Sequence, residues 1–246
     1  MVEKLISDVL QYGGYAVELL LVCLLVFRGH YRRLVVVTFY VSLLLLTDGV
    51  IRRGILDHFG ISSRQYWYCF WLTDVLLALA SFLVVCSFFR RACLREDKMW
   101  RFIRQALVCV FILVLGISSL SLSRNYSQLT ASFIVEFEQN LCFTCVVLNT
   151  LLYLLMQQIE SPDEELGLLV CGIGIQYAGP AASFALAHLT FGEHFSEFLI
   201  KLMMPVCTLG MLLTWFYAVV RMPKVGVVRA AAGKFAGVEE AAAGRV

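Results

Sequence analysis

The stretch Trp67–Val85, WYCFWLTDVLLALASFLVV, decides the structural class of this protein. Its length is close to the ~20 apolar residues that an α-helix needs to cross the ~30 Å hydrocarbon core of a membrane. One charged residue, Asp74, interrupts it, and no basic residue lies within the run. The stretch therefore predicts a membrane-spanning helix, and it raises the question of what an acid without a local partner does there.

The composition of the whole chain extends this prediction. Of 246 residues, 60% are hydrophobic and 15% are charged, whereas a soluble domain has about 25% charged residues. The alternating segments of about ten residues that a spanning β-barrel requires are not seen. Backbone groups in lipid must form their hydrogen bonds internally, so we predict an all-α polytopic membrane protein, a seven-helix bundle. The expected spans are 9–27, 34–51, 66–89, 102–122, 132–156, 166–189 and 199–220.

These spans form one transmembrane domain, residues 1–221, followed by a short tail rich in Ala and Gly, residues 222–246. Most of the 20 Lys and Arg residues fall on one side when alternate loops are assigned to opposite sides of the membrane. Short cytoplasmic loops carry such residues. We therefore expect the N-terminus outside and the C-terminus inside. The expected location is a cell membrane, specifically a bacterial inner membrane.

Two acid–base pairs have the i,i+4 spacing that brings side chains to one face of a helix. They are Asp48 with Arg52 and Glu197 with Lys201. We interpret both as structural ion pairs.

Other ionisable residues inside the spans lack such a partner, and residues of this kind are functional candidates in a membrane. At ~1.5 Å per residue, Glu18 lies about 15 Å from the inner boundary and Asp74 about 24 Å from it. The polar residues are concentrated from the midplane outward, which indicates a polar cavity that opens to the outer side. The residues predicted to line it are Glu18, Asp48, Asp74, Glu136, Gln176 and Arg53.

Two points in this hypothesis stay open. Glu136 is expected to face inward in preference to Glu138, because it shares a helix face with Gln139 and Asn140. The alternative to a cavity is a set of interhelical pairs that lock the bundle, such as Asp74 with an arginine that follows the second span.

The basic segment 90–104 lies on the expected inner side and could dock a partner protein or anionic lipid, although a simple topology anchor also explains it.

The chain has nine cysteines, nearly all inside expected spans, and the pair Cys142 and Cys145 is interpreted as helix packing. We expect no cofactor, no metal and no nucleic-acid partner. The expected surroundings are the lipid bilayer.

Several motifs along the chain resemble uncharacterised seven-helix membrane proteins of acidobacterial type. These motifs are His30-Tyr-Arg-Arg33 after the first span, the aromatic entry and acid of Tyr66–Asp74, an acid early in the fifth span, and Trp215. That family usually has Glu where Asp74 stands. The resemblance implies a seven-helix architecture and brings no known activity.

The helix number and length are also similar to those of microbial rhodopsins, in which a lysine midway along the seventh helix holds retinal. Here Lys201 is the available lysine and it lies near the outer boundary, so a retinal protein is a minor alternative.

We expect a receptor-like or accessory module that binds a small ligand or a partner from the outer side. A small secondary transporter or proton-coupled carrier is the second hypothesis. The motifs HExxH and GxSxG are missing, which argues against an enzyme.

Overall fold

The computed structural model describes residues 2–60, 63–93, 97–122, 129–159, 163–189 and 193–221, and this part of the chain contains helices and short turns with no strand. The expected tail, residues 222–246, lies outside the described residues. The helices are α1 Val2–Phe27, the 3-10 turn η1 His30–Arg32, α2 Val35–Leu45, the π-helix η2 Leu46–Ile51, α3 Arg52–Phe59, α4 Arg64–Ala92, α5 Asp97–Leu122, α6 Leu129–Gln158, α7 Glu164–Leu189 and α8 Glu193–Arg221.

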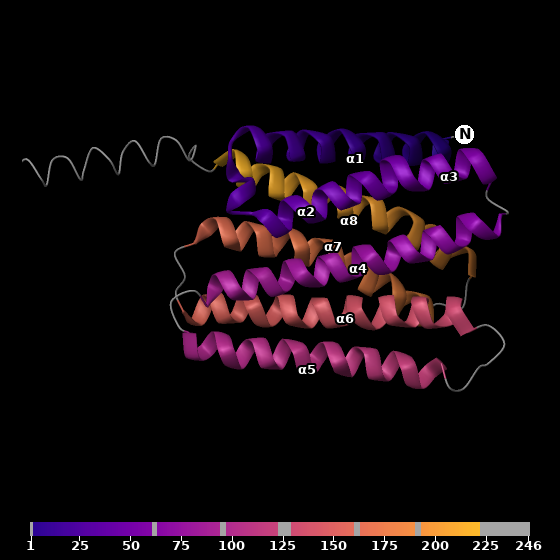
Figure 1. Ribbon diagram of the computed structural model, residues 1–246. Coiled ribbons are helices and arrows are strands. Elements are labelled where there is room, and N and C mark those ends of the chain that lie inside the picture. The colour runs from indigo at the N-terminus through magenta and orange to yellow at the C-terminus, as the bar shows by residue number, and fades with distance from the viewer. Residues whose placement is uncertain are drawn as a thin grey trace, which may run out of the picture.

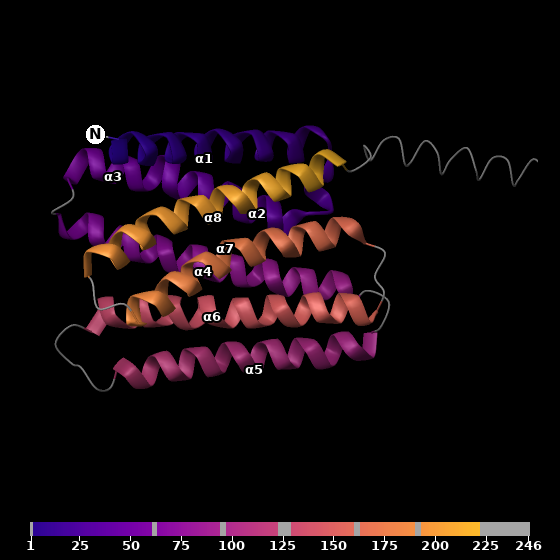
Figure 2. The ribbon, with the colours of Figure 1, turned by 180° about the vertical axis from the view of Figure 1, so that it is seen from behind.

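The long helices run side by side, and they begin and end at two opposite ends of the bundle (Figure 1). We call the end at which α1 begins the N-terminal end, and the other the opposite end. α7 and α8 lie on the face away from α4, as the view from behind shows (Figure 2). The contacts between helices close a ring in the order α1, α2, α4, α6, α7, α8, and α5 packs outside it against α6 and α4.

The expected second span, 34–51, is longer in the structure than its apolar run. α2, η2 and α3 follow one another without a break from Val35 to Phe59. The sequence predicts that the span ends before Arg52 and Arg53, yet these two residues continue the helix. The reason is that Arg52 is neutralised by acids from two helices, as described below, so it need not leave the bundle.

α7 and α8 pack most closely, because small residues of α7 face α8. A Cβ atom at Gly172 would lie 2.5 Å from Nε1 of Trp215. Trp215 is fully buried and its Nε1 donates a hydrogen bond of 2.9 Å to the carbonyl of Leu169. Its ring meets Tyr40 edge to face, with 5.9 Å between the ring centres. This tryptophan therefore joins α2, α7 and α8 in the core.

The outside of the bundle is apolar. Phe27, Leu72 and Phe102 are 87%, 71% and 73% exposed. Within the described residues, six helical stretches are long and apolar enough to cross a membrane: 9–27, 35–59, 64–92, 98–119, 136–158 and 203–221. α7 is not among them, although it belongs to the same ring. An apolar exterior on helices of spanning length is the arrangement of a membrane-type helical bundle.

Candidate functional site

The guanidinium of Arg52 is the centre of a polar cluster that joins α3 to α4. Its Nη1 donates to Oδ1 of Asp48 at 2.9 Å, its Nη2 donates to Asp74, and its Nε donates to the hydroxyl of Thr73 at 3.0 Å. The guanidinium carbon also lies 4.4 Å from the centre of the Phe70 ring. The i,i+4 pair expected from sequence is present, and Asp74 shares the same arginine. One cation thus serves two carboxylates, and the cluster keeps an excess of one negative charge when both are ionised.

The π-helix η2 places Asp48 at this point. Within it the backbone N–H of Arg52 bonds to the carbonyl of Thr47, five residues back. Single π-turns inside longer helices are rare and are found often at functional sites. The main-chain carbonyl of Asp48 accepts a hydrogen bond of 3.1 Å from the hydroxyl of Tyr15 on α1. The wider turn therefore connects the continuous helix formed by α2, η2 and α3 to its two neighbours, α1 and α4.

A polar stripe on α1 faces this cluster. Nε2 of Gln11 donates to the hydroxyl of Tyr15 at 2.8 Å, and Glu18 follows three residues later on the same face. Glu18 is 3% exposed, and its Oε2 atom has no hydrogen-bond partner among the described residues. It lies close enough to Asp48 for the two charges to repel. A buried carboxylate oxygen without a partner is costly, so Glu18 is the member of the cluster that lacks a counterpart.

A cavity of about 640 Å³ lies against these groups, between α1, η2, α3, the start of α4 and the middle of α8. It extends from Leu10, Leu56 and Tyr66 near the N-terminal end to Glu18 about halfway along α1. Arg53 lines it as well, and its Nη2 donates to the hydroxyl of Tyr12 at 2.7 Å. The volume is within the range of ~300–1,000 Å³ that small-molecule sites occupy.

Three of the six residues predicted for one cavity line it: Glu18, Asp48 and Arg53. Asp74 is connected to it through Arg52. Gln176 lines a second, smaller cavity, and the half-buried Glu136 lines neither of the two. The acid of α6 that reaches a cavity is Glu138.

The residues predicted for the cavity did not include its tyrosines. Tyr12, Tyr15 and Tyr66 all line the large cavity. The signal was available on α1, where Gln11, Tyr15 and Glu18 recur at spacings of four and three and so share one helix face. The second expected ion pair, Glu197 with Lys201, belongs to α8. The helix is described at these positions, but the two side chains lie outside the described part of the chain.

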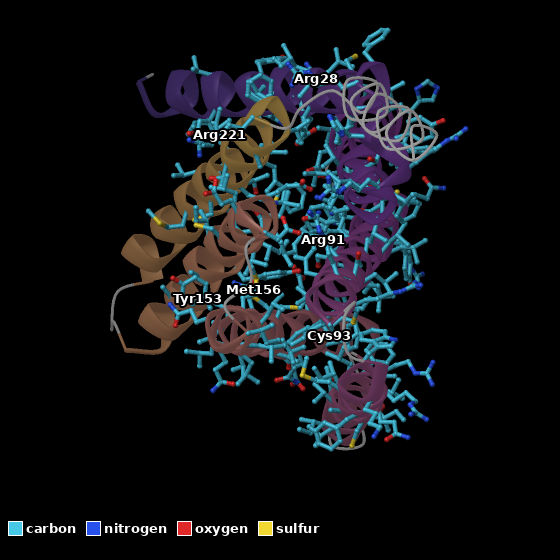
Figure 3. All side chains as sticks on the ribbon, turned by 90° about the vertical axis from the view of Figure 1, so that its left-hand side faces the viewer. Arg28, Arg91, Cys93, Tyr153, Met156 and Arg221 are labelled. Atoms are coloured by element: carbon cyan, nitrogen blue, oxygen red, sulfur yellow. The ribbon has the colours of Figure 1, made fainter. Side chains whose placement is uncertain are left out.

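A second cluster holds the opposite end of the ring together, and Figure 3 looks toward it with Arg28, Arg91 and Arg221 in view. Arg91 of α4 donates to Asp163 at 3.0 Å and to Glu165 at 2.6 Å, both at the start of α7. Arg28 donates to the carbonyl of Val220 at 2.8 Å, at the end of α8. These residues have a structural explanation in the contacts they make.

The basic segment 90–104 is therefore partly used inside the protein through Arg91. Residues 94–96 of this segment lie outside the described part. On α5, Arg101, Phe102 and Arg104 are exposed. A partner at this segment stays a prediction.

The chain matches no family model, no curated protein and no solved structure.

Proposed function

We propose that this protein is a receptor-like membrane module that binds a small cationic ligand, such as an amine, in the large cavity from the outer side. The observation that carries the proposal is the unpartnered oxygen of Glu18 at the inner limit of a polar cavity. An ammonium group supplies N–H donors and a positive charge, and both are what this carboxylate lacks.

The charge balance supports a cation over an anion. The cavity and the cluster behind it hold four acids, Glu18, Asp48, Asp57 and Asp74, against Arg52 and Arg53. Arg52 is already shared by two carboxylates, and Arg53 is bonded to Tyr12. A cationic ligand would bring the site closer to neutrality. An anionic one would face the excess of acid.

Seven spans and an N-terminus on the outer side belong to this proposal. The distribution of Lys and Arg along the chain supports the orientation, and the membership of α7 in the ring supports the seventh span. The resemblance to membrane proteins of acidobacterial type leads us to propose a bacterial inner membrane. Reporter fusions at the two termini would test this, and both termini on the same side would contradict an odd number of spans.

A binding experiment tests the ligand class. The probes are small aromatic and aliphatic amines, each paired with the alcohol of the same skeleton, and the readout is the Tm of the purified protein in detergent. We expect at least one amine to raise the Tm while its alcohol does not, and the variant Glu18→Gln to lose that rise. No rise with any amine, or an undiminished rise in Glu18→Gln, would contradict the proposal.

A proton-coupled carrier is the second candidate, and one observation favours it. Met204 lines both the large cavity and the smaller one that Glu138 lines. The two polar cavities therefore share one flexible residue. Amine uptake into proteoliposomes that depends on a pH gradient would favour the carrier. Amine binding without uptake would favour the receptor-like module.

A further inference from the structure

The smaller cavity lies inside the ring and has a volume of about 90 Å³. Residues of α2, α4, α6, α7 and α8 line it, and its polar lining is mostly oxygen. The oxygen-bearing side chains are Tyr40, Ser81, Glu138, Gln176 and Tyr177. Liquid water occupies about 30 Å³ per molecule, so the cavity has room for a small ion with one or two waters and is too small for the ligand proposed above.

Two of these oxygens are available to a ligand. Oε1 of Gln176 and the hydroxyl of Tyr177 are buried and have no hydrogen-bond partner of ordinary geometry among the described residues. Tyr177 is 9% exposed, and its hydroxyl lies near Ser81 and Cys145. The hydroxyl of Ser81 donates to the carbonyl of Ala78 at 2.7 Å, which leaves its lone pairs available to a cation.

The charge of the pocket also lacks compensation. Among the residues that line it, Glu138 is the single carboxylate, and no Lys, Arg or His is present. One carboxylate with neutral oxygens around it suits a monovalent cation. In the part of the chain that the structure describes, no group of three or more His, Cys, Asp or Glu residues could hold a metal ion, so a divalent site is not indicated.

We propose that this pocket binds a monovalent cation of the size of Na⁺, with Glu138, Gln176 and Tyr177 as its protein ligands. Hard cations take oxygen ligands from carboxylates, amide carbonyls and water. Because the cavity must hold the ion together with the one or two waters that complete its coordination, we expect the smaller Na⁺ to be preferred over K⁺. This site goes beyond the function proposed for the large cavity and does not depend on it, because it shares none of the three ligands with that cavity.

A titration of the purified protein in detergent tests the cation site. The probe is NaCl exchanged for choline chloride at constant ionic strength, with KCl as the second cation and Tm as the readout. A ligand that binds the folded state raises stability with ligand concentration. We expect a saturable rise of about 5–10 °C when Na⁺ exceeds its Kd about a hundredfold, and a much smaller rise with K⁺.

Matched variants assign the effect to the pocket. Glu138→Gln keeps the size of the side chain and removes its charge, and it should abolish the rise with Na⁺. Glu136→Gln makes the same change two residues away on a residue that lines neither cavity, and it should keep the rise. If Glu138→Gln does not fold, Tyr177→Phe removes one oxygen and should weaken Na⁺ binding about tenfold.

The outcomes separate the two proposals. Equal Tm values in Na⁺, K⁺ and choline would show a pocket filled by water alone and would overturn the cation site, as would a rise retained in Glu138→Gln. Equal rises with Na⁺ and K⁺ would overturn the preference for Na⁺. Glu18→Gln should retain the rise with Na⁺ while losing amine binding, so either proposal can fail without the other.

Discussion

At the scale of single residues, Arg52 does most to define the site. It bonds to Asp48, Asp74 and Thr73, and it is 19% exposed at its side chain. Its planar guanidinium presents several donors in fixed directions, which a lysine cannot reproduce. Asp74 has no partner within its own helix. Its partner is Arg52, which comes from the neighbouring helix α3.

Replacing Arg52 should therefore destabilise the bundle. In Arg52→Gln, Asp48 and Asp74 lose their shared cation, and we expect a loss of about 2 kcal/mol in the free energy of unfolding, less than for a fully buried pair because the cluster is partly exposed. Arg53→Gln is the matched control, since Arg53 is exposed and makes one bond, to Tyr12. Denaturant unfolding in detergent measures both variants. Equal losses would show that the cluster has no special role.

His30, in the turn after α1, is the second residue with a clear prediction. It is 1% exposed, and neither ring nitrogen has a hydrogen-bond partner among the described residues. Burial lowers the pKa of its imidazole below the ordinary value; the charge of Glu165 opposes this shift, while those of Arg28 and Arg33 add to it. The folded protein thus binds a proton at His30 less readily than the unfolded chain does.

Stability should consequently fall with acidification in a defined window. Above the unfolded pKa of about 6.5, His30 is neutral in both states and has no effect on the pH dependence. As the pH falls below that value toward the lowered folded pKa, the unfolded state takes up more protons and stability decreases. The Tm between pH 7.5 and 5.5 should drop less in His30→Phe than in the parent. His58→Gln, at an exposed position, should behave like the parent.

At the scale of secondary structure, the contact of α7 with α8 depends on glycine. The Cβ atom of an alanine at 172 would meet Trp215, which is held by its own hydrogen bond to Leu169. Gly167 lies on the same helix in open space, because a Cβ atom there would meet no atom of another helix within 4 Å in the described part of the chain.

Gly172 and Gly167 should therefore respond to alanine with opposite signs. Gly172→Ala should lower the free energy of unfolding by about 1–3 kcal/mol through overpacking. Gly167→Ala should raise it by up to about 1 kcal/mol, because alanine favours the helix. Thermal unfolding measures both. A stable Gly172→Ala variant would contradict the close packing of Trp215 against α7.

Local patterns predicted part of these elements. The apolar runs located the long helices, and the i,i+4 rule found Asp48 with Arg52. The continuation of the second helix to Phe59 could not be read locally, because two arginines normally end an apolar run and the neutralising Asp74 comes from α4. The choice of Glu136 over Glu138 rested on neighbours within α6, whereas the inward face is set by the helices that pack against it.

At the scale of the whole molecule, the large and the smaller cavity described above both lie within the six-helix ring, and α5 lies outside it. The sequence predicted one cavity, since a depth count along each helix gives the height of a residue and not its direction around the axis. Gln176 consequently lines the smaller cavity and Glu18 the large one. The proposed function requires that the large cavity admit water and cations from the outer side as far as Glu18.

Thiol accessibility at position 18 tests this requirement most directly. Glu18→Cys is treated in intact cells with a membrane-impermeant trimethylammonium methanethiosulfonate, and the parent with its nine native cysteines sets the background. A thiol reacts as its thiolate, which needs an aqueous surrounding to form. Leu19→Cys is the control, because Leu19 is 55% exposed on the apolar outside of the bundle. We predict rapid labelling of Glu18→Cys from outside and none of Leu19→Cys. Labelling of Leu19→Cys but not of Glu18→Cys, or labelling of Glu18→Cys from the inner side alone, would contradict an outward-facing cavity.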